Sequence, residues 1–279
     1  MWGAIFGDVL GSTEEFGETK YDDLYSISIF EKDAHITDDS VLTCAVADWL
    51  LHDIDKNFYC DDYLRLSLAK RFVHWTRWSA DIEMAYGNSY IDWFLRAEKE
   101  GKYDPINSYG NGSAMRVSPV GWYFDTLEET LRFAKLSADV THNHPEGEKG
   151  AMAIAASVFL ARNGYQKTDM KDFALRSFGY EKILKSAKQL RDDSRWVCTC
   201  QETVPLAIVA FLESTDYESA IRLAFSFGCD VDTVACMAGA IAEAYYKHIP
   251  KAIEDFCQKQ IPQEVVDIVA AFNDVAGVR

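Results

Sequence analysis

Two short stretches of the chain each place two aspartates beside a threonine, directly ahead of an apolar run with helical spacing. The six residues are Thr37, Asp38 and Asp39 in HITDDSVLTC, and Asp230, Asp232 and Thr233 in FGCDVDTVAC. Either stretch alone is explained by helix capping, because Thr, Ser and Asp are favoured at helix N-termini. Together they supply only hard oxygen ligands, which suit Mg²⁺, Mn²⁺ or Ca²⁺, with enough carboxylates for a pair of ions.

The N-terminal stretch GAIFGDVLGSTEEF spaces Gly3, Gly7 and Gly11 four residues apart. This spacing is typical of a helix that packs closely against a neighbour. Glu14 and Glu15 follow the predicted helix in a loop, where a carboxylate is usually only solvated. A nearby site would give one of them a role.

Two other loops carry residues that suit ligand binding. SYGNGSAMR, at 108–116, is rich in small residues whose amides can approach a phosphate or ribose, although it lacks the lysine and spacing of a P-loop. THNHPEG, at 141–147, places two histidines before an apolar helix but does not match the HExxH zinc-protease motif. A histidine in such a place is more often a capping or hydrogen-bonding residue than a catalyst.

The composition excludes several classes of protein. A formal charge of −16 over 279 residues argues against a general grip on nucleic acid, which needs clustered Lys and Arg. The longest apolar stretch, Ala151 to Ala161, is far shorter than the roughly 20 residues of a membrane helix. The start of the chain, MWGAIFGDVLG, has no basic lead and carries an aspartate in its apolar run, and the seven cysteines are irregularly spaced. We therefore expect a cytoplasmic protein with reduced thiols and no membrane or nucleic-acid partner.

Helical periodicity dominates the chain, and strand-type alternation is nearly absent. The predicted helices cover Val41 to Leu51, Leu64 to Trp78, Leu127 to Ala138, Ala151 to Arg162, Met170 to Phe178, Tyr180 to Leu190, Val204 to Leu212, Tyr217 to Phe227, Thr233 to Lys247 and Gln263 to Phe272. Gly11 to Ile36 and Asn88 to Ser118 are expected to be long loops, and long loops in a compact domain are usually functional. With no linker-like composition, the sequence predicts one compact all-α domain over residues 1–279.

Taken in order, GAIFGDVLGSTEEF, TDDS, SYGNGSAMRVSPVGW, THNHPEG and GCDVDTVACMAGAIAEAYY resemble the ADP-ribosylglycohydrolase family, the relatives of dinitrogenase reductase-activating glycohydrolase. The resemblance runs from Gly3 to about Tyr246. It implies an all-α fold with a dinuclear Mg²⁺ or Mn²⁺ centre that hydrolyses the bond between ADP-ribose and an acceptor. The expected partner is thus an ADP-ribosylated protein or a small ADP-ribose conjugate, and we expect a monomer.

The resemblance also implies roles for individual residues. The metal ligands would be Thr37, Asp38, Asp39, Asp230, Asp232 and Thr233, and the catalytic residues Glu15 and Asp39. Glu14 would then be a bystander. The diphosphate and ribose would be bound by Ser108, Tyr109, Gly110, Asn111, Gly112 and Ser113, with His142 lining the ribose pocket. Carboxylates at such a site stabilise the oxocarbenium character that develops at the ribose carbon.

The chain departs from the family pattern at two positions. Cys229 stands where the family usually has a second glycine, at a place where the backbone is expected to need a positive φ. Val231 stands where a small polar residue is usual.

The leading hypothesis is a metal-dependent hydrolase acting on N-linked ADP-ribosyl-arginine. The alternatives are a hydrolase of O-linked ADP-ribose (ADP-ribosyl-serine or O-acetyl-ADP-ribose), a catalytically weak ADP-ribose-binding protein of the same fold, and a metal-dependent phosphohydrolase that would release AMP.

Overall fold

The computed structural model describes residues 1–54, 60–82 and 85–278. These residues form helices and connecting segments; they contain no strand, only one isolated bridge between Gly110 and Thr199. The α-helices are α1 (Trp2–Gly11), α2 (Asp38–His52), α3 (Asp61–Trp78), α4 (Asn88–Glu100), α5 (Gly112–Met115), α6 (Ser118–Tyr123), α7 (Leu127–Asp139), α8 (Pro145–Arg162), α9 (Lys167–Phe178), α10 (Ala187–Asp193), α11 (Cys200–Glu213), α12 (Tyr217–Ser226), α13 (Val231–Tyr246), α14 (Lys251–Cys257) and α15 (Gln263–Ala276). The 3₁₀-helices are η1 (Ser12–Glu14), η2 (Leu24–Ser26), η3 (Ser79–Asp81) and η4 (Glu181–Leu184). The prediction of an all-α fold is confirmed.

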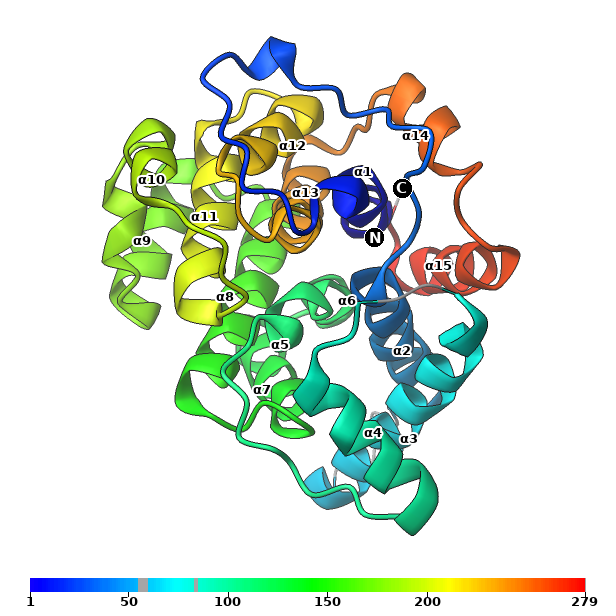
Figure 1. The fold of residues 1–279 in the computed structure, drawn as a ribbon. Helices are drawn as coiled ribbons and strands as arrows, with labels where there is room; N and C mark the ends of the chain where they lie inside the picture. Colours follow the sequence, from blue (N-terminus) through cyan, green and yellow to red (C-terminus); the bar gives the residue numbers. More distant parts are fainter. Residues whose placement is uncertain (55–59, 83–84, 279) are drawn as a thin grey trace.

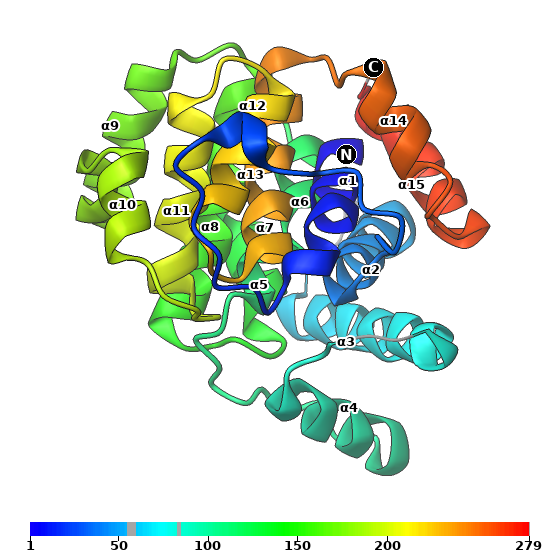
Figure 2. The same ribbon diagram turned by 45° about the horizontal axis from the view of Figure 1, so that its top comes forward.

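Helix α13 lies at the centre of the molecule and packs against α1, α8, α11 and α12 (Figures 1 and 2). Its residues from Val231 to Ala244 are all buried, as expected for a helix that is apolar on every side. Helices α9 and α10 lie outside α11 on one flank, whereas α2, α3 and α15 lie on the other side of α1 (Figure 2). The described helices share one hydrophobic core.

The three glycines of α1 allow that helix to approach α13 closely. A Cβ added at Gly3 would lie 2.4 Å from the Gly239 carbonyl oxygen, and one at Gly7 would lie 2.2 Å from the Ala235 carbonyl oxygen. At Gly11 it would meet the Asp232 Cα at 2.4 Å. The predicted close packing of this helix is thus confirmed, and the third glycine sets α1 directly against one of the candidate ligands.

We expect Gly7→Ala to push α1 away from α13, since the clash is with backbone and not with a flexible side chain. The free energy of unfolding should fall by about 1–3 kcal/mol, as for overpacked cores. Denaturant unfolding measures it. Gly87→Ala is the control for stability, because nothing lies within 4 Å of a Cβ added there. Equal losses in both variants would contradict the role of close helix packing.

Two expectations about the connections have different outcomes. The segment from Gly11 to Ile36 contains only the short helices η1 and η2. Two arginines hold it in place: the Arg191 guanidinium donates to the Tyr21 carbonyl at 2.6 Å, and the Arg222 guanidinium donates to the Ile27 carbonyl at 2.7 Å. The prediction of a loop over Asn88 to Ser118 is wrong, because α4 and α5 lie within it.

Helix α4 has a polar exposed face, and these polar residues make the composition of the segment resemble that of a loop. Its other face buries Tyr90, Trp93 and Ala97, and Gly101 ends it with a φ of +65°. The predicted helix over Tyr180 to Leu190 is in fact two: η4 ends at Leu184, and Ser186 starts α10 with a capping box that includes Gln189. Helix α14 was not predicted.

No described helix is both long enough and apolar enough to span a membrane. All seven cysteines are described, and each is a free thiol.

Candidate active site

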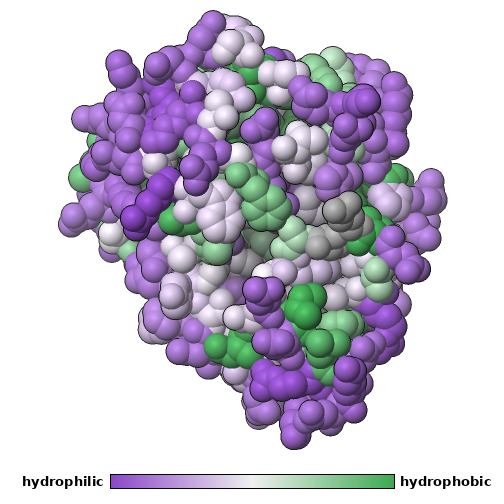
Figure 3. Space-filling model, in the orientation of Figure 1, coloured by the Kyte–Doolittle hydropathy of each residue, from purple (hydrophilic) through white to green (hydrophobic). Residues whose placement is uncertain are grey.

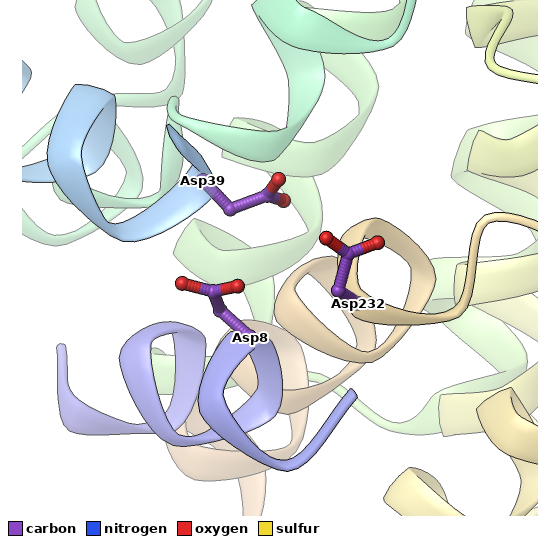
Figure 4. Close-up of side chains that lie close together, drawn as sticks. All are labelled: Asp8, Asp39 and Asp232. Atoms are coloured by element: carbon purple, nitrogen blue, oxygen red, sulfur yellow. The ribbon is translucent and has the colours of Figure 1, made fainter. Parts of the chain in front are cut away.

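Three helices bring one aspartate each to a common point. Asp8 comes from α1, Asp39 from the first turn of α2 and Asp232 from the first turn of α13, and their carboxylates point toward one another (Figure 4). One oxygen of each lies within 4.8 Å of the others, and all three residues are buried. Two threonines join them: Thr37 Oγ1 lies 3.4 Å from Asp232 Oδ2, and Thr233 Oγ1 donates to Asp39 Oδ2 at 3.2 Å.

The two halves predicted from the sequence therefore meet in space, and a third residue, Asp8, lies beside them. Sequence reasoning missed Asp8 as a member of the site, although an aspartate within an apolar run is the signal that could have found it. Asp8 accepts hydrogen bonds from the Thr37 amide (3.0 Å), the Thr37 hydroxyl (2.7 Å), the Ser40 amide (3.1 Å) and the Ser40 hydroxyl. It thus caps α2 from another helix and fixes the direction of the α2 aspartates.

The remaining acceptors of the cluster suit a divalent cation. Asp39 Oδ1 is buried without a hydrogen-bond partner among the described residues, whereas both Asp8 oxygens are already used. A buried carboxylate oxygen without a partner is costly unless something binds it. The neighbouring donors are carboxylate and hydroxyl oxygens, the hard ligands that Mg²⁺ and Mn²⁺ prefer. The residues present therefore fit such an ion.

A pocket of about 570 Å³ opens beside the cluster. Its walls include Glu15, Asp38, Asp39, Asp230 and Thr233 of the predicted site residues, joined by Ser108, Gly110, Asn111, Gly112 and His142. On the face shown in Figure 3, a paler centre with several hydrophobic residues is surrounded by a hydrophilic periphery. The pocket thus joins the candidate metal ligands to the glycine-rich loop.

Four of the predicted site residues do not line the pocket wall. Thr37 and Asp232 lie behind it in the aspartate cluster. The Ser113 hydroxyl points the other way and donates to the Gly147 carbonyl at 2.8 Å. Tyr109 is exposed, with its ring 5.3 Å from that of His144.

Glu15 stands at the mouth of the pocket, directly after η1. Trp196 donates from Nε1 to the Glu15 carbonyl at 3.0 Å, and its ring lies 6.1 Å from that of Phe16. Glu14 is not among the residues that line the pocket. The structure thus separates the two glutamates, as the motif implied.

Burial raises the pKa of every carboxylate in the site, and repulsion by neighbouring carboxylates adds to the shift of Glu15, Asp38, Asp39 and Asp232. The pKa of Glu15 rises to about 8, chiefly through burial and then through Asp38 and Asp230. Burial, with repulsion by Asp8 and Asp230, raises the pKa of Asp38 to about 7. Burial raises the pKa of Asp230 to about 6 and shifts the pKa values of Asp39 and Asp232 well above their ordinary range. The cluster carries more negative charge than this interior favours, which is typical of a functional site.

The glycine-rich loop is held against the segment before α11. The Asn111 amide donates to the Cys198 carbonyl at 2.9 Å, and the Cys200 amide donates to the Tyr109 carbonyl at 3.0 Å. Asn111 Nδ2 donates to Asp230 Oδ2 at 2.7 Å, which ties the loop to the candidate ligands. The Gly110 amide is occupied by Ser108 Oγ, at 3.1 Å.

The two helix starts differ in their caps. Thr37 caps α2 as predicted, since its hydroxyl accepts from the Asp39 amide at 3.3 Å. Asp230 sits at the N-cap of α13 but makes no capping bond, so the prediction of capping fails there and its carboxylate faces Asn111.

The expectation of a positive φ at Cys229 is wrong. The left-handed residue is Gly228, with a φ of +55°, and a Cβ there would lie 2.6 Å from the Thr19 carbonyl oxygen. Cys229 and Val231 are both buried apolar neighbours of the site. Cys229 therefore imposes no backbone strain on the loop.

The model of the ADP-ribosylglycohydrolase family matches residues 1–276. The chain is 27% identical to ADP-ribosylhydrolase ARH3 of Mus musculus, over 92% of this chain and 85% of that protein. It is also 27% identical to ADP-ribosylarginine hydrolase Tri1 of Pseudomonas putida (strain GB-1), over 88% of this chain and 69% of that protein.

A solved structure described as an ADP-ribosylglycohydrolase-related protein complex has a similar fold, with a TM-score of 0.71 and 20% identity. The match covers 98% of this chain and 96% of that one. Because the family model spans nearly the whole sequence and the fold agrees, the chain belongs to the ADP-ribosylglycohydrolase family and is a glycohydrolase.

Proposed function

We propose that the protein is a metal-dependent hydrolase that releases ADP-ribose from ADP-ribosylated arginine. The observation that carries this proposal is the contact between the two aspartate–threonine stretches, beside a pocket that the glycine-rich loop also lines. Family membership and the names of ADP-ribosylhydrolase ARH3 and ADP-ribosylarginine hydrolase Tri1 support the reaction class.

The residues proposed to hold a pair of divalent cations are Thr37, Asp38, Asp39, Asp230, Asp232 and Thr233. Bound there, Mg²⁺ or Mn²⁺ would offset the crowded negative charge and attract hydroxyl and phosphate oxygens of the substrate. Asp8 orients the α2 ligands through its four hydrogen bonds and is assigned a positioning role.

The loop and the pocket floor are proposed to bind the diphosphate and ribose. Gly110 and Gly112 line the pocket, and without a Cβ they let a ligand approach the backbone of the loop closely. Among the described residues that line this pocket, Arg116 is the one Lys or Arg, and it is fully buried. Its charge favours an anionic group at this end of an otherwise acidic pocket.

Glu15 is proposed to move the proton. With a pKa of about 8, raised chiefly by burial, its carboxyl exchanges a proton near neutral pH. As the bond between the ribose carbon and the acceptor nitrogen breaks, the ribose carbon gains oxocarbenium character, which the buried carboxylates stabilise. A water oxygen then bonds to that carbon, the acceptor nitrogen gains one proton, and the products are ADP-ribose and free arginine.

The mouth of the pocket favours arginine as the acceptor. Phe16 is 67% exposed and Trp196 is 37% exposed, and this aromatic pair flanks Glu15. A guanidinium group stacks on aromatic faces and pairs with carboxylates. A serine acceptor offers neither property.

One assay tests the proposal against its rivals. The protein is incubated with arginine-, serine- and glutamate-linked ADP-ribosyl peptides, with Mg²⁺ or with EDTA, and the products are identified by mass. We expect free ADP-ribose from the arginine-linked peptide, only with metal. Release from the serine-linked peptide alone would replace the acceptor, AMP would indicate a phosphohydrolase, and binding without turnover would indicate an ADP-ribose-binding protein.

Replacing Glu15 by glutamine should lower kcat by roughly 100-fold or more, since general acid–base groups contribute about 10² to 10⁴. Affinity for ADP-ribose, measured by calorimetry, should stay close to that of the wild type. Glu14→Gln is the matched control, because Glu14 precedes Glu15 but does not line the pocket. Equal activity in the two variants would remove Glu15 from the mechanism.

A further inference from the structure

Thr141 links Arg116 to His142 in a buried chain of hydrogen bonds. Arg116 Nη2 donates to Thr141 Oγ1 at 2.8 Å, and Thr141 Oγ1 lies 2.7 Å from His142 Nδ1. Arg116 and Thr141 are fully buried, and His142 is 5% exposed. Arg116 is also held by the Phe72 ring, 4.2 Å from its guanidinium carbon, and by the Ser137 carbonyl at 3.3 Å. These contacts hold the Arg116 end of the hydrogen-bond chain in place.

The chemistry of the three groups fixes the direction of the protons. Arginine has only donors, so Thr141 Oγ1 accepts from Arg116. If His142 also donated from Nδ1, the threonine hydroxyl hydrogen would need a third partner, and the described residues offer none. A buried hydroxyl without an acceptor is costly, so the hydroxyl donates to His142 Nδ1. That nitrogen carries a lone pair, and the ring proton sits on Nε2.

The other nitrogen faces the glycine-rich loop. A Cβ added at Gly112 would lie 3.1 Å from His142 Nε2, and one at Gly110 would lie 3.6 Å from it. Both His142 and these glycines line the pocket, and Nε2 has no hydrogen bond within the described residues. Its proton is therefore available to a ligand.

We propose that Arg116 and Thr141 hold His142 as the neutral tautomer with its proton on Nε2, so that His142 donates a hydrogen bond to an oxygen of bound ADP-ribose. This deepens the proposed function and rests on it for the identity of the ligand. Burial and the nearby Arg116 charge also lower the pKa of His142 well below its usual value, so the ring stays neutral. Arg116 and Thr141 are positioning residues, and His142 is the one that contacts the ligand.

The first experiment reads the tautomer directly. The chain has six histidines, so ¹⁵N-histidine labelling with a His142→Gln variant identifies the His142 signals. In the metal-loaded wild-type protein we expect Nδ1 to resonate as an unprotonated nitrogen and Nε2 as a protonated one, without ligand. A protonated Nδ1 would overturn the proposal, whatever substrate the enzyme prefers.

The second experiment measures the consequence for binding. Thr141→Val removes the hydroxyl with little change in shape, and we expect it to weaken ADP-ribose binding by about 5- to 10-fold and to leave His142 in a mixture of tautomers. Thr141→Ser keeps the hydroxyl and should restore both properties. Thr130→Val is the matched control, because Thr130 is equally buried and its hydroxyl bonds only the Thr126 carbonyl.

The outcomes separate this proposal from the proposed function. Unchanged affinity in Thr141→Val, beside a wild type that binds ADP-ribose, would overturn the role of His142 as a donor. A wild type that binds no ADP-ribose would instead overturn the proposed function, and the nitrogen signals would still decide the tautomer.

Discussion

Asp232→Asn should strongly reduce metal-dependent hydrolysis while making the metal-free protein more stable. Asp232 belongs to the aspartate cluster, and its two oxygens already face the Thr233 amide and Thr37. Loss of a ligand charge should lower kcat/KM by roughly 100-fold or more. Burial and repulsion raise the pKa of Asp232 well above its ordinary range, which costs stability at neutral pH. Asparagine removes that cost, so unfolding without metal should need about 1 kcal/mol more, or about 2–4 °C in Tm.

The opposite signs make this variant informative. Substitution of a residue needed only for folding would lower both activity and stability. Asp232→Asn is instead expected to lower activity and to raise the stability of the metal-free protein. Hydrolysis with Mg²⁺ and thermal unfolding with EDTA measure the two effects. Asp267→Asn is the control, because its carboxylate bonds only the Gln263 side chain on the surface of α15. Full activity in Asp232→Asn would contradict the proposal that two metal ions bind at this site.

Without metal, the protein should lose stability as the pH rises from about 5 to 8, and added metal should reverse that loss. The folded protein holds protons on Asp230, Asp38 and Glu15 with pKa values of about 6, 7 and 8, raised chiefly by burial. An unfolded carboxyl titrates near pH 4, so stability is fully present below that pH and is lost as these groups ionise. For Asp230 alone the loss is about 3 kcal/mol.

Divalent cations bind the ionised carboxylates, so their effect on Tm should grow with pH. At a metal concentration of about 1,000 times Kd the gain is about 4 kcal/mol, or roughly 10 °C for a chain of this size. Scanning calorimetry at pH 5.5 and pH 8, with EDTA or with Mg²⁺, checks both parts. A metal-free Tm that rises with pH would show that these carboxylates do not titrate as the structure indicates.

The sequence indicates which helix ends carry the proposed ligands, but not that those ends meet. Thr37 lies beside Asp232, and Gly7 and Gly11 let α1 approach α13 closely. Asp8 of α1 accepts a hydrogen bond from the Thr37 hydroxyl. The glycine spacing predicts that the first helix packs closely against another helix. It does not identify that helix, because spacing within one segment carries no information about its neighbour. The order of the motifs along the chain, through the family resemblance, indicated that the two stretches belong to one site. Local periodicity does not indicate this.

The errors have local causes. The composition of the α4 segment predicts a loop because the polar residues of its exposed face outnumber the buried ones, such as Trp93. The positive φ expected at Cys229 belongs to Gly228, one residue earlier, and sequence alone does not resolve a shift of one residue in a turn. The Arg116 and Thr141 contacts depend on side-chain orientation, which no spacing rule predicts.

The contact between α1 and α13 also affects the order in which the protein folds during synthesis. Residues 2–11 and 231–246 are far apart in the chain, and the aspartate cluster needs both of them. During synthesis, α1 leaves the ribosome long before α13 exists, and closing so long a loop is entropically slow. The proposed cation site is therefore expected to be among the last features to form, and only a nearly complete fold would bind metal.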